Sequence, residues 1–117
     1  MQLEKDPNGK SMNEPGAKAD DGKVRVALTL KGFAHALWEV SRVGTFGAQK
    51  YTPNGWVTVP NGPERYEDAE ARHLLKDWMG EDLDPETDIR HKAHKAWNAL
   101  AVLELAIREQ KAKNNPK

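Results

Sequence analysis

The stretch DPETDIRHKAHKAWNALAVLELAI, residues 84–107, carries the clearest helical pattern in the chain and decides the predicted fold. Asp84 is a candidate N-cap, Pro85 suits the first helical position, and Glu86 places a negative charge where the helix dipole favours one. Apolar residues then recur at intervals of three or four, the spacing of one helix face. They are Ile89, Ala93, Ala96, Leu100, Leu103 and Ile107. The pattern predicts one long helix that begins at Asp84.

The rest of this predicted helix divides into a polar stripe and an apolar segment. The stripe lies opposite the apolar face and consists of Thr87, His91, His94 and Asn98. Residues 99–107 are apolar on almost every side, with a glutamate as the only interruption. A helix that is apolar all round must be covered all round, which three helices of a small domain do not easily achieve. We therefore expect a homodimer or a homotetramer.

Two further helices are expected earlier in the chain. Apolar residues recur at helical spacing over residues 31–50, where Gly44 and Gly47 are weak points or sites of close packing. Just before them, residues 24–28 alternate as a short extended arm would. A second helix is expected over residues 63–79, because proline is favoured at its first position and a glycine follows its last residue.

A long loop and a polar tail complete the organisation. Residues 52–63 contain Pro-Asn-Gly twice and predict a long loop, either packed or a linker; such loops are uncommon in compact domains and often functional. Residues 1–22 hold almost no large apolar side chain and predict a disordered tail, so the folded domain spans residues 23–113. The expected fold is all-α: a small bundle of three main helices with a long structured loop, completed by oligomerisation.

Composition excludes several classes of function. The 18 Lys and Arg residues balance the 18 Asp and Glu residues, and a chain of zero formal charge is not expected to bind polymeric nucleic acid. The absence of cysteine excludes disulfides, thiolate metal sites and a cysteine nucleophile. No apolar run approaches the roughly 20 residues of a membrane span, and the first residues do not resemble a secretory signal. A cytoplasmic protein without membrane contact is expected.

Residues 65–98 concentrate acidic, basic and imidazole side chains. Three of the four histidines lie here, and two of them, His91 and His94, are one helical turn apart, so that their rings can face one point. Carboxylates at this density suit Mg²⁺, and the imidazoles shift the preference towards Mn²⁺. The stretch is therefore a candidate site for one of these ions.

Each of these residues also has a structural interpretation. Helix capping alone explains Asp84 and Glu86. Asp68 and Arg72, four residues apart on one helix face, can form a solvated ion pair, and the two neighbouring histidines can belong to a hydrogen-bonded stripe. Trp56 can stack on a base or lie buried under its own loop. The other tryptophans, Trp38, Trp78 and Trp97, are expected in the core.

In combination, the residues from Glu39 to Glu104 resemble a known family. Their order and spacing are similar to those of a small, phage-rich family, the dATP/dGTP diphosphohydrolase N-terminal domains, which lies near the all-α MazG-like nucleotide pyrophosphohydrolases. The matching residues are Phe46-Gly47-Ala48-Gln49-Lys50-Tyr51, Trp56, Arg65-Tyr66-Glu67-Asp68-Ala69, Arg72-His73-Leu74, Gly80-Glu81, Asp84, Glu86, His91, His94 and Asn98-Ala99-Leu100.

The resemblance implies metal-dependent hydrolysis of a purine (deoxy)nucleoside triphosphate between its α- and β-phosphates, in phage nucleotide metabolism within a host cytoplasm. The products would be a monophosphate and pyrophosphate. Mg²⁺ or Mn²⁺ would be held by ligands among Glu39, Asp68, Asp84, Glu86, His91 and His94. The substrate would be bound by Lys50, Tyr51, Trp56, Arg65, Tyr66 and Arg72. His73 and Glu81 are the candidate catalytic residues, with His73 or a nearby carboxylate taking a proton from water.

Two other classes of function remain open from the sequence. The chain can be a nucleotide-binding protein that does not cleave its ligand, such as a sponge that sequesters a signalling nucleotide. It can also be an interaction module whose histidine stripe is structural. Metal-dependent hydrolysis separates the enzyme from the sponge, and a nucleotide-induced thermal shift separates both from the interaction module.

Overall fold

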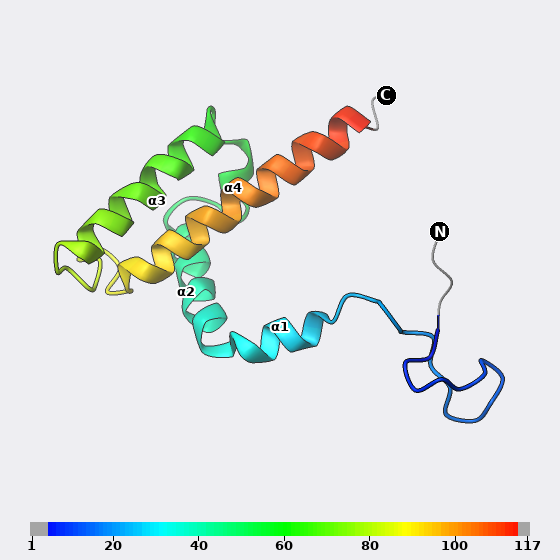
Figure 1. Cartoon of the computed structure of the whole chain (residues 1–117). Helices are drawn as coiled ribbons and strands as arrows, with labels where there is room; N and C mark the ends of the chain where they lie inside the picture. Colours follow the sequence, from blue (N-terminus) through cyan, green and yellow to red (C-terminus); the bar gives the residue numbers. More distant parts are fainter. Residues whose placement is uncertain (1–4, 115–117) are drawn as a thin grey trace. The chain divides into compact units, whose positions relative to one another are not determined.

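Helices form all the regular structure of residues 5–114, the part that the computed structural model describes. The elements, labelled in Figure 1, are α1 (Val26–Gly32), α2 (Ala34–Lys50), the 3-10 helix η1 (Gly55–Thr58), α3 (Gly62–Trp78) and α4 (His91–Asn114). The expected all-α fold is confirmed. None of the described helices is both long and apolar enough to span a membrane.

The chain divides into two compact units, which meet in sequence between Phe33 and Ala34. In the first unit, turns precede α1. The Asp6 carboxylate accepts hydrogen bonds of 2.9–3.1 Å from the backbone N–H groups of Lys10, Lys18 and Asn8, which together lower its pKa. Disorder of residues 1–22 stays a prediction, and the first four of them lie outside the described residues.

The predicted helix over residues 31–50 is interrupted. α1 ends at Gly32, and Phe33 leaves the helical conformation with φ −111° and ψ 23° before α2 begins. Glycine is a poor helix former, which makes this position a weak one for a continuous helix. Residues 26–28 are helical, so the extended arm considered over residues 24–28 is wrong for these positions. The helix predicted over residues 63–79 is confirmed to within one residue at each end.

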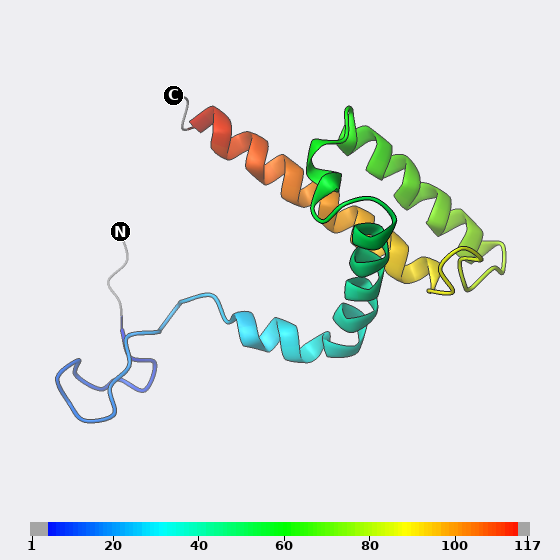
Figure 2. The same ribbon diagram turned by 180° about the vertical axis from the view of Figure 1, so that it is seen from behind.

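In the second unit, α3 and α4 lie side by side in both views of the ribbon, and α2 packs against α4 (Figures 1 and 2). The predicted loop of residues 52–63 is structured, because it contains η1. Its 3-10 turn contacts α3.

The predicted start of the long helix at Asp84 is wrong, because α4 begins at His91. Asp84 does accept two backbone N–H hydrogen bonds from the residues that follow it, at 2.8 and 3.2 Å, as an N-cap would. After Asp84 the chain forms a turn and not a helix, because Asp88 has φ +59° and Leu83 pairs with Arg90 in an isolated antiparallel bridge. Residues 84–90 therefore form a closed loop before the helix.

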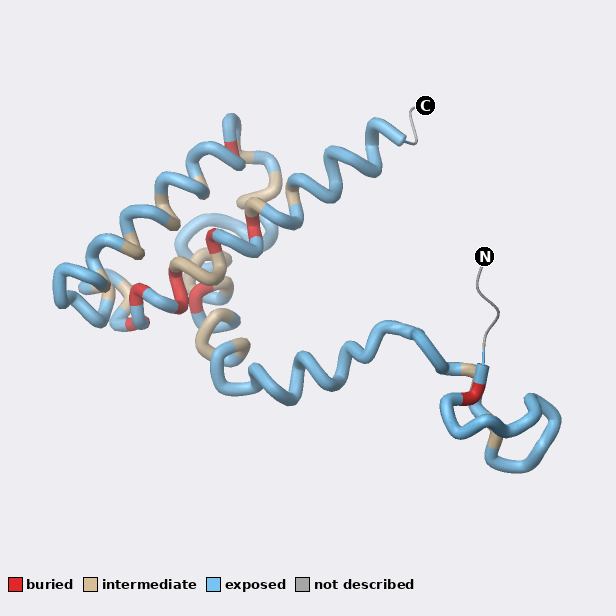
Figure 3. Tube along the Cα trace, viewed as in Figure 1, coloured by how far each residue is buried: buried red, intermediate tan, exposed pale blue. Residues whose placement is uncertain are grey.

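α4 turns its polar stripe inward and part of its apolar stripe outward (Figure 3). His91, His94 and Asn98 are 0%, 7% and 6% exposed, whereas Leu100 and Leu103 are 49% and 56% exposed. The small buried apolar core of the second unit consists of Val43, Ile89, Ala93 and Ala101, with Trp97 packed against it.

Only part of the tryptophan prediction is confirmed. Trp97 packs against the core, but Trp38 and Trp78 are 75% and 73% exposed, so their assignment to the core is wrong. Gly44 is a site of close packing, because a Cβ atom there would lie 3.3 Å from Trp97 Nε1. Gly47 has no such neighbour within 4 Å.

Candidate functional site

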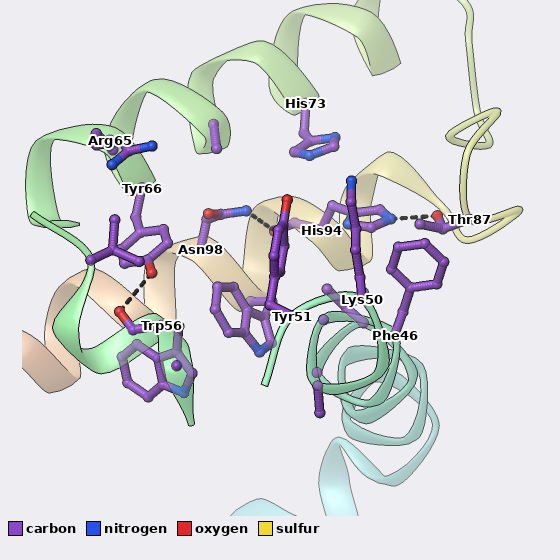
Figure 4. A pocket seen from close by; sticks show the side chains of 18 of the residues that line it. Phe46, Lys50, Tyr51, Trp56, Arg65, Tyr66, His73, Thr87, His94 and Asn98 are labelled. Carbon is purple, nitrogen blue, oxygen red and sulfur yellow. Dashed lines mark hydrogen bonds between the residues drawn. The ribbon is translucent and has the colours of Figure 1, made fainter. Parts of the chain in front are cut away.

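A pocket of about 1010 Å³ opens between α2, α3, α4 and the loops around residues 51–59 and 84–87 (Figure 4). Most of the predicted site residues line it: Lys50, Tyr51, Trp56, Arg65, Tyr66, Asp68, Arg72, His73, Asp84, Glu86 and His94. Glu39, Glu81 and His91 are not among its lining residues. Segments far apart in sequence thus meet at one cavity.

A cluster of three histidines forms one end of the pocket. His73 Nδ1 and His91 Nδ1 are 2.8 Å apart, and the rings of His73 and His94 are stacked with centroids 4.6 Å apart and planes 12° from parallel. His91 is fully buried behind the pocket, and its Nε2 lies 2.8 Å from Glu81 Oε1. Glu81 therefore acts on this cluster through His91.

The hydrogen bonds of this cluster define its tautomers. A carboxylate only accepts, so His91 Nε2–H donates to Glu81. The Nδ1 atom of a neutral His91 can then only accept, so His73 Nδ1–H donates to it. In this arrangement the Nε2 lone pair of His73 takes no part in the hydrogen bonds that link His73, His91 and Glu81.

The histidines of the pocket are uncharged at neutral pH. Burial, reinforced by the neighbouring His94 and His91, lowers the pKa of His73 to about 4. Burial also lowers the pKa of His94, whose Nε2 is hydrogen-bonded to Thr87 Oγ1 at 2.7 Å. Neutral imidazoles are the form in which histidine binds metal ions or accepts a proton.

Asp84 is a second carboxylate close to this cluster, with a ligand atom within 4.8 Å of those of His73 and His91. Burial alone would raise its pKa, but the backbone N–H groups of Glu86 and Thr87, together with His94 and His73, lower the pKa overall. Asp84 is therefore ionised. It remains negative beside neutral imidazoles, which is the electrostatic setting of a cation site.

His73, Asp84 and His91 can hold a metal ion, because each offers one ligand atom and these atoms lie within 4.8 Å of one another. Asp84 and His91 belong to the predicted ligand set, whereas His73 was predicted as a catalytic residue. The structure places other predicted ligands elsewhere: Glu39 pairs with Arg90 outside the pocket.

Three more predicted ligands lie in the pocket but outside this group. Glu86 forms an ion pair of 2.9 Å with Lys50, and this hydrogen bond raises the pKa of the lysine. His94 is engaged by Thr87. Asp68 lines the pocket from α3. The link from Lys50 to Glu86 joins the end of α2 to the loop of residues 84–90.

An aromatic cluster forms the other end of the pocket. The rings of Trp56, Tyr66 and Trp97 contact each other edge to face, with centroids 5.6–6.3 Å apart. Tyr66 Oη donates to the backbone oxygen of Trp56 at 2.6 Å, which anchors the loop on α3. The Arg108 guanidinium lies 5.8 Å from the Trp56 ring. Trp56 is thus packed under its loop and lines the pocket at once.

The cations of the pocket come from two helices, Arg65 and Arg72 from α3 and Lys50 from α2. Arg65 and Arg72 are seven residues apart on α3, and Arg65 Nη1 donates to the Pro60 oxygen at 3.3 Å. Tyr51 is 71% exposed and lies beside Lys50, whose Nζ is 5.3 Å from the ring centroid. The arrangement offers cations, aromatic rings and a candidate metal group to one ligand.

Sequence reasoning missed the two polar residues of the pocket that are hydrogen-bonded to His94. Thr87 contacts His94 and accepts the N–H of Ile89 at 3.2 Å, and the Asn98 amide donates to the carbonyl oxygen of His94 at 2.8 Å. Both belonged to the predicted polar stripe. Their i, i+4 or i, i+7 spacing to His94 was the signal that could have assigned them to the site.

Comparison with known proteins identifies a family whose match includes the residues of this pocket. The family described as dATP/dGTP diphosphohydrolase, N-terminal, matches residues 13–115. The chain belongs to this family. A dATP/dGTP diphosphohydrolase of Salmonella phage PMBT28 is 38% identical over 87 residues, which are 74% of this chain and 28% of that protein. The chain thus spans little more than a quarter of the length of that curated relative.

Family membership confirms the resemblance inferred from the sequence. The family match runs through all the pocket-lining elements, from α2 to the middle of α4. No solved structure matches the chain.

Proposed function

We propose that the pocket binds a purine deoxynucleoside triphosphate and hydrolyses it between the α- and β-phosphates, releasing a monophosphate and pyrophosphate. The observation that carries the proposal is the candidate metal group of His73, Asp84 and His91 at a pocket that also holds arginines and aromatic rings. Family membership and the name of the phage relative support the same reaction.

A divalent ion fits the donor set of His73, Asp84 and His91. Two imidazoles and one carboxylate suit Mn²⁺ or another transition metal better than Mg²⁺, which prefers oxygen ligands. An ion would bind the Nδ1 lone pair of His91 and so would replace the hydrogen bond from His73 Nδ1–H. His91 would keep its donation of Nε2–H to Glu81, the outer contact that metal-bound histidines usually make. When bound, the ion would offset phosphate charge and lower the pKa of a water molecule.

The cations of the pocket bind the phosphates in this proposal. Arg72 and Arg65 project from α3, and the planar guanidinium suits bidentate contact with phosphate oxygens. Lys50 already pairs with Glu86 and exchanges this exposed partner for a phosphate oxygen. A chain of zero formal charge needs such local cations to hold a polyanion.

His94 accepts the proton of the attacking water in this proposal. It lines the pocket, lies outside the candidate metal group, and is kept neutral by burial and oriented by the Thr87 hydroxyl. The roles of His73 and Glu81 then differ from those implied by the resemblance. His73 is a metal ligand, and Glu81 orients His91.

The first test is a panel of the four deoxynucleoside triphosphates with Mg²⁺ and with Mn²⁺, assayed for pyrophosphate release and for a shift in melting temperature. We expect metal-dependent pyrophosphate release that is greatest for dATP or dGTP. A melting shift without pyrophosphate under every metal would identify a nucleotide-binding protein that does not cleave its ligand. Neither signal with any triphosphate would refute the proposal.

Matched variants locate the activity in the pocket. Asp84→Asn is expected to abolish turnover and weaken Mn²⁺ binding measured by electron paramagnetic resonance. Asp88→Asn is the control, because Asp88 is exposed in the same loop and asparagine tolerates its positive φ. Arg72→Ala is expected to weaken the binding of triphosphates more than the binding of nucleosides. Arg42→Ala is its control, because Arg42 is exposed.

A further inference from the structure

Asn98 is a buried amide in the pocket wall, and within residues 5–114 only its nitrogen has a hydrogen-bond partner. The residue is 6% exposed, lies one turn beyond His94 on α4, and donates from Nδ2 to the His94 carbonyl oxygen at 2.8 Å (Figure 4). A backbone carbonyl can only accept, so the nitrogen must be the amide atom on that side. The orientation of Oδ1, away from His94, is thereby fixed.

The Oδ1 atom of Asn98 remains an acceptor with access to the pocket. Among the hydrogen bonds within residues 5–114, none ends on this oxygen. In the same part of the chain, no fully buried side-chain nitrogen or oxygen lacks a partner, so Oδ1 is not sealed from the cavity that Asn98 lines. A well-shielded acceptor without a protein donor is suited to a donor on a ligand.

The place of Asn98 in the pocket indicates which part of a nucleotide it meets. His91 of the candidate metal group lies seven residues earlier on α4, about 10 Å away along the helix at 1.5 Å per residue. On the other side of Asn98, Trp97 and Tyr66 close the pocket. A nucleotide with its phosphates at the metal group therefore extends its base towards Asn98.

Tyr51 supplies an exposed aromatic ring in the same pocket. Its side chain is 71% exposed, whereas the rings of Trp56, Tyr66 and Trp97 are engaged with each other. In the view of Figure 4, Tyr51 stands between Lys50 and Asn98. A base stacked on such a ring is held by its face while its edge stays free for hydrogen bonding.

We propose that Asn98 Oδ1 accepts a hydrogen bond from the amino group of a base stacked on Tyr51, and so selects nucleotides whose base carries an amino group. The inference rests on the proposed function, because it takes a nucleoside triphosphate as the ligand. A base without this donor leaves the acceptor unpaired in a shielded site, which weakens binding on the order of tenfold.

The test compares affinities of the full chain by isothermal titration calorimetry, using α,β-methylene triphosphates that cannot be cleaved between those phosphates. One ligand is the deoxyadenosine analogue; the other carries unsubstituted purine, which lacks only the amino group. The wild-type chain is expected to bind the amino-bearing ligand about tenfold more tightly. Asn98→Ala is expected to bind both ligands with equal affinity, because the substitution weakens only the binding of the amino-bearing ligand.

Two further variants keep the test independent of folding. Asn98→Ser retains a hydroxyl that can donate to the carbonyl four residues earlier, yet lacks the amide oxygen, and is expected to lose the preference as well. Gln110→Ala removes an exposed amide of the same helix outside the pocket and is expected to keep the preference. Circular dichroism confirms that each variant retains its helices.

A third ligand separates the base from the sugar. The 3′-deoxy form of the adenine analogue is expected to bind as tightly as its parent in every variant. A preference for the 3′-hydroxyl that disappears in Asn98→Ala would assign Oδ1 to the sugar and overturn the proposal. Equal wild-type affinity for the two purine ligands would overturn it while the proposed function stands. Binding of no triphosphate at all would overturn both.

Discussion

Acidification is expected to destabilise the fold through His73. Its pKa falls from 6.5 to about 4 on folding, chiefly through burial and then through the neighbouring His94 and His91. Between these two values the unfolded chain binds a proton that the folded chain does not, so stability rises with pH. The contribution is complete above pH 6.5 and is lost as the pH falls towards 4.

The magnitude follows from the size of the shift. At 1.36 kcal/mol per pKa unit, a fall from 6.5 to about 4 sets an upper limit of about 3.4 kcal/mol. His73 is only partly buried, and water screens its charge, so we expect a loss of about 1–2 kcal/mol in the free energy of unfolding. His94 shifts in the same direction and adds to the loss.

The assay is urea unfolding, followed by circular dichroism at half-unit steps of pH, at constant ionic strength and with a chelator present. His73→Asn keeps an amide in reach of His91 but does not titrate, so its stability should fall less steeply over this range. His35→Asn, an exposed substitution on α2, should follow the wild type. Parallel curves for the wild type and His73→Asn would refute the reasoning.

Leu103→Glu tests the exposed apolar stripe of α4: Leu103 is 56% exposed, so the free energy of unfolding should change by less than about 0.5 kcal/mol. If the stripe joins subunits, sedimentation velocity will show a monomeric variant; a monomeric wild type would contradict assembly. Gly44→Val should lower stability to urea by about 1–3 kcal/mol, because its Cβ alone would lie 3.3 Å from Trp97 Nε1. Gly47→Ala, with open space around it, should raise stability by about 0.5–1 kcal/mol. A stabilising Gly44→Val together with a destabilising Gly47→Ala would contradict the close packing of Gly44 on Trp97. Removal of residues 1–22 should leave the calorimetric melting of the remaining chain unchanged, whereas a large decrease would show that the tail packs.

The existence of the helices was predictable because its signals are local. Apolar spacing and a proline near the first turn defined α3, which spans Gly62–Trp78, to within one residue at each end. Asp84 shows where local signals fail. Its carboxylate makes the same backbone hydrogen bonds in a turn as at a helix N-cap, so the sequence alone does not separate the two.

The direction in which α4 faces was not predictable from hydrophobicity. Leu100 and Leu103 indicated the buried side, yet the structure buries His91 and Asn98 instead. His91 can be buried because His73 and Glu81, which come from other segments, satisfy its two ring nitrogens. Only the tertiary fold supplies these partners.

The sequence predicted which residues line the candidate site better than it predicted which of them contact each other. Lys50, Arg72 and Asp84 were expected in one site and do line one pocket. The contact between His73 and His91 spans 18 residues, and the ion pair of Lys50 with Glu86 spans 36. Contacts of this range depend on how α2, α3 and α4 cross, which residue spacing within one helix does not encode.

The distribution of the tryptophans gives the protein a built-in optical reporter. Trp38 and Trp78 are 75% and 73% exposed and accessible to a collisional quencher such as iodide, whereas Trp56 and Trp97 line the pocket. These four are all the tryptophans of the chain. With the exposed pair quenched or replaced by phenylalanine, the remaining emission comes from the pocket alone. Ligand arrival can then be followed by fluorescence in the unlabelled protein, on the timescale of a stopped-flow experiment.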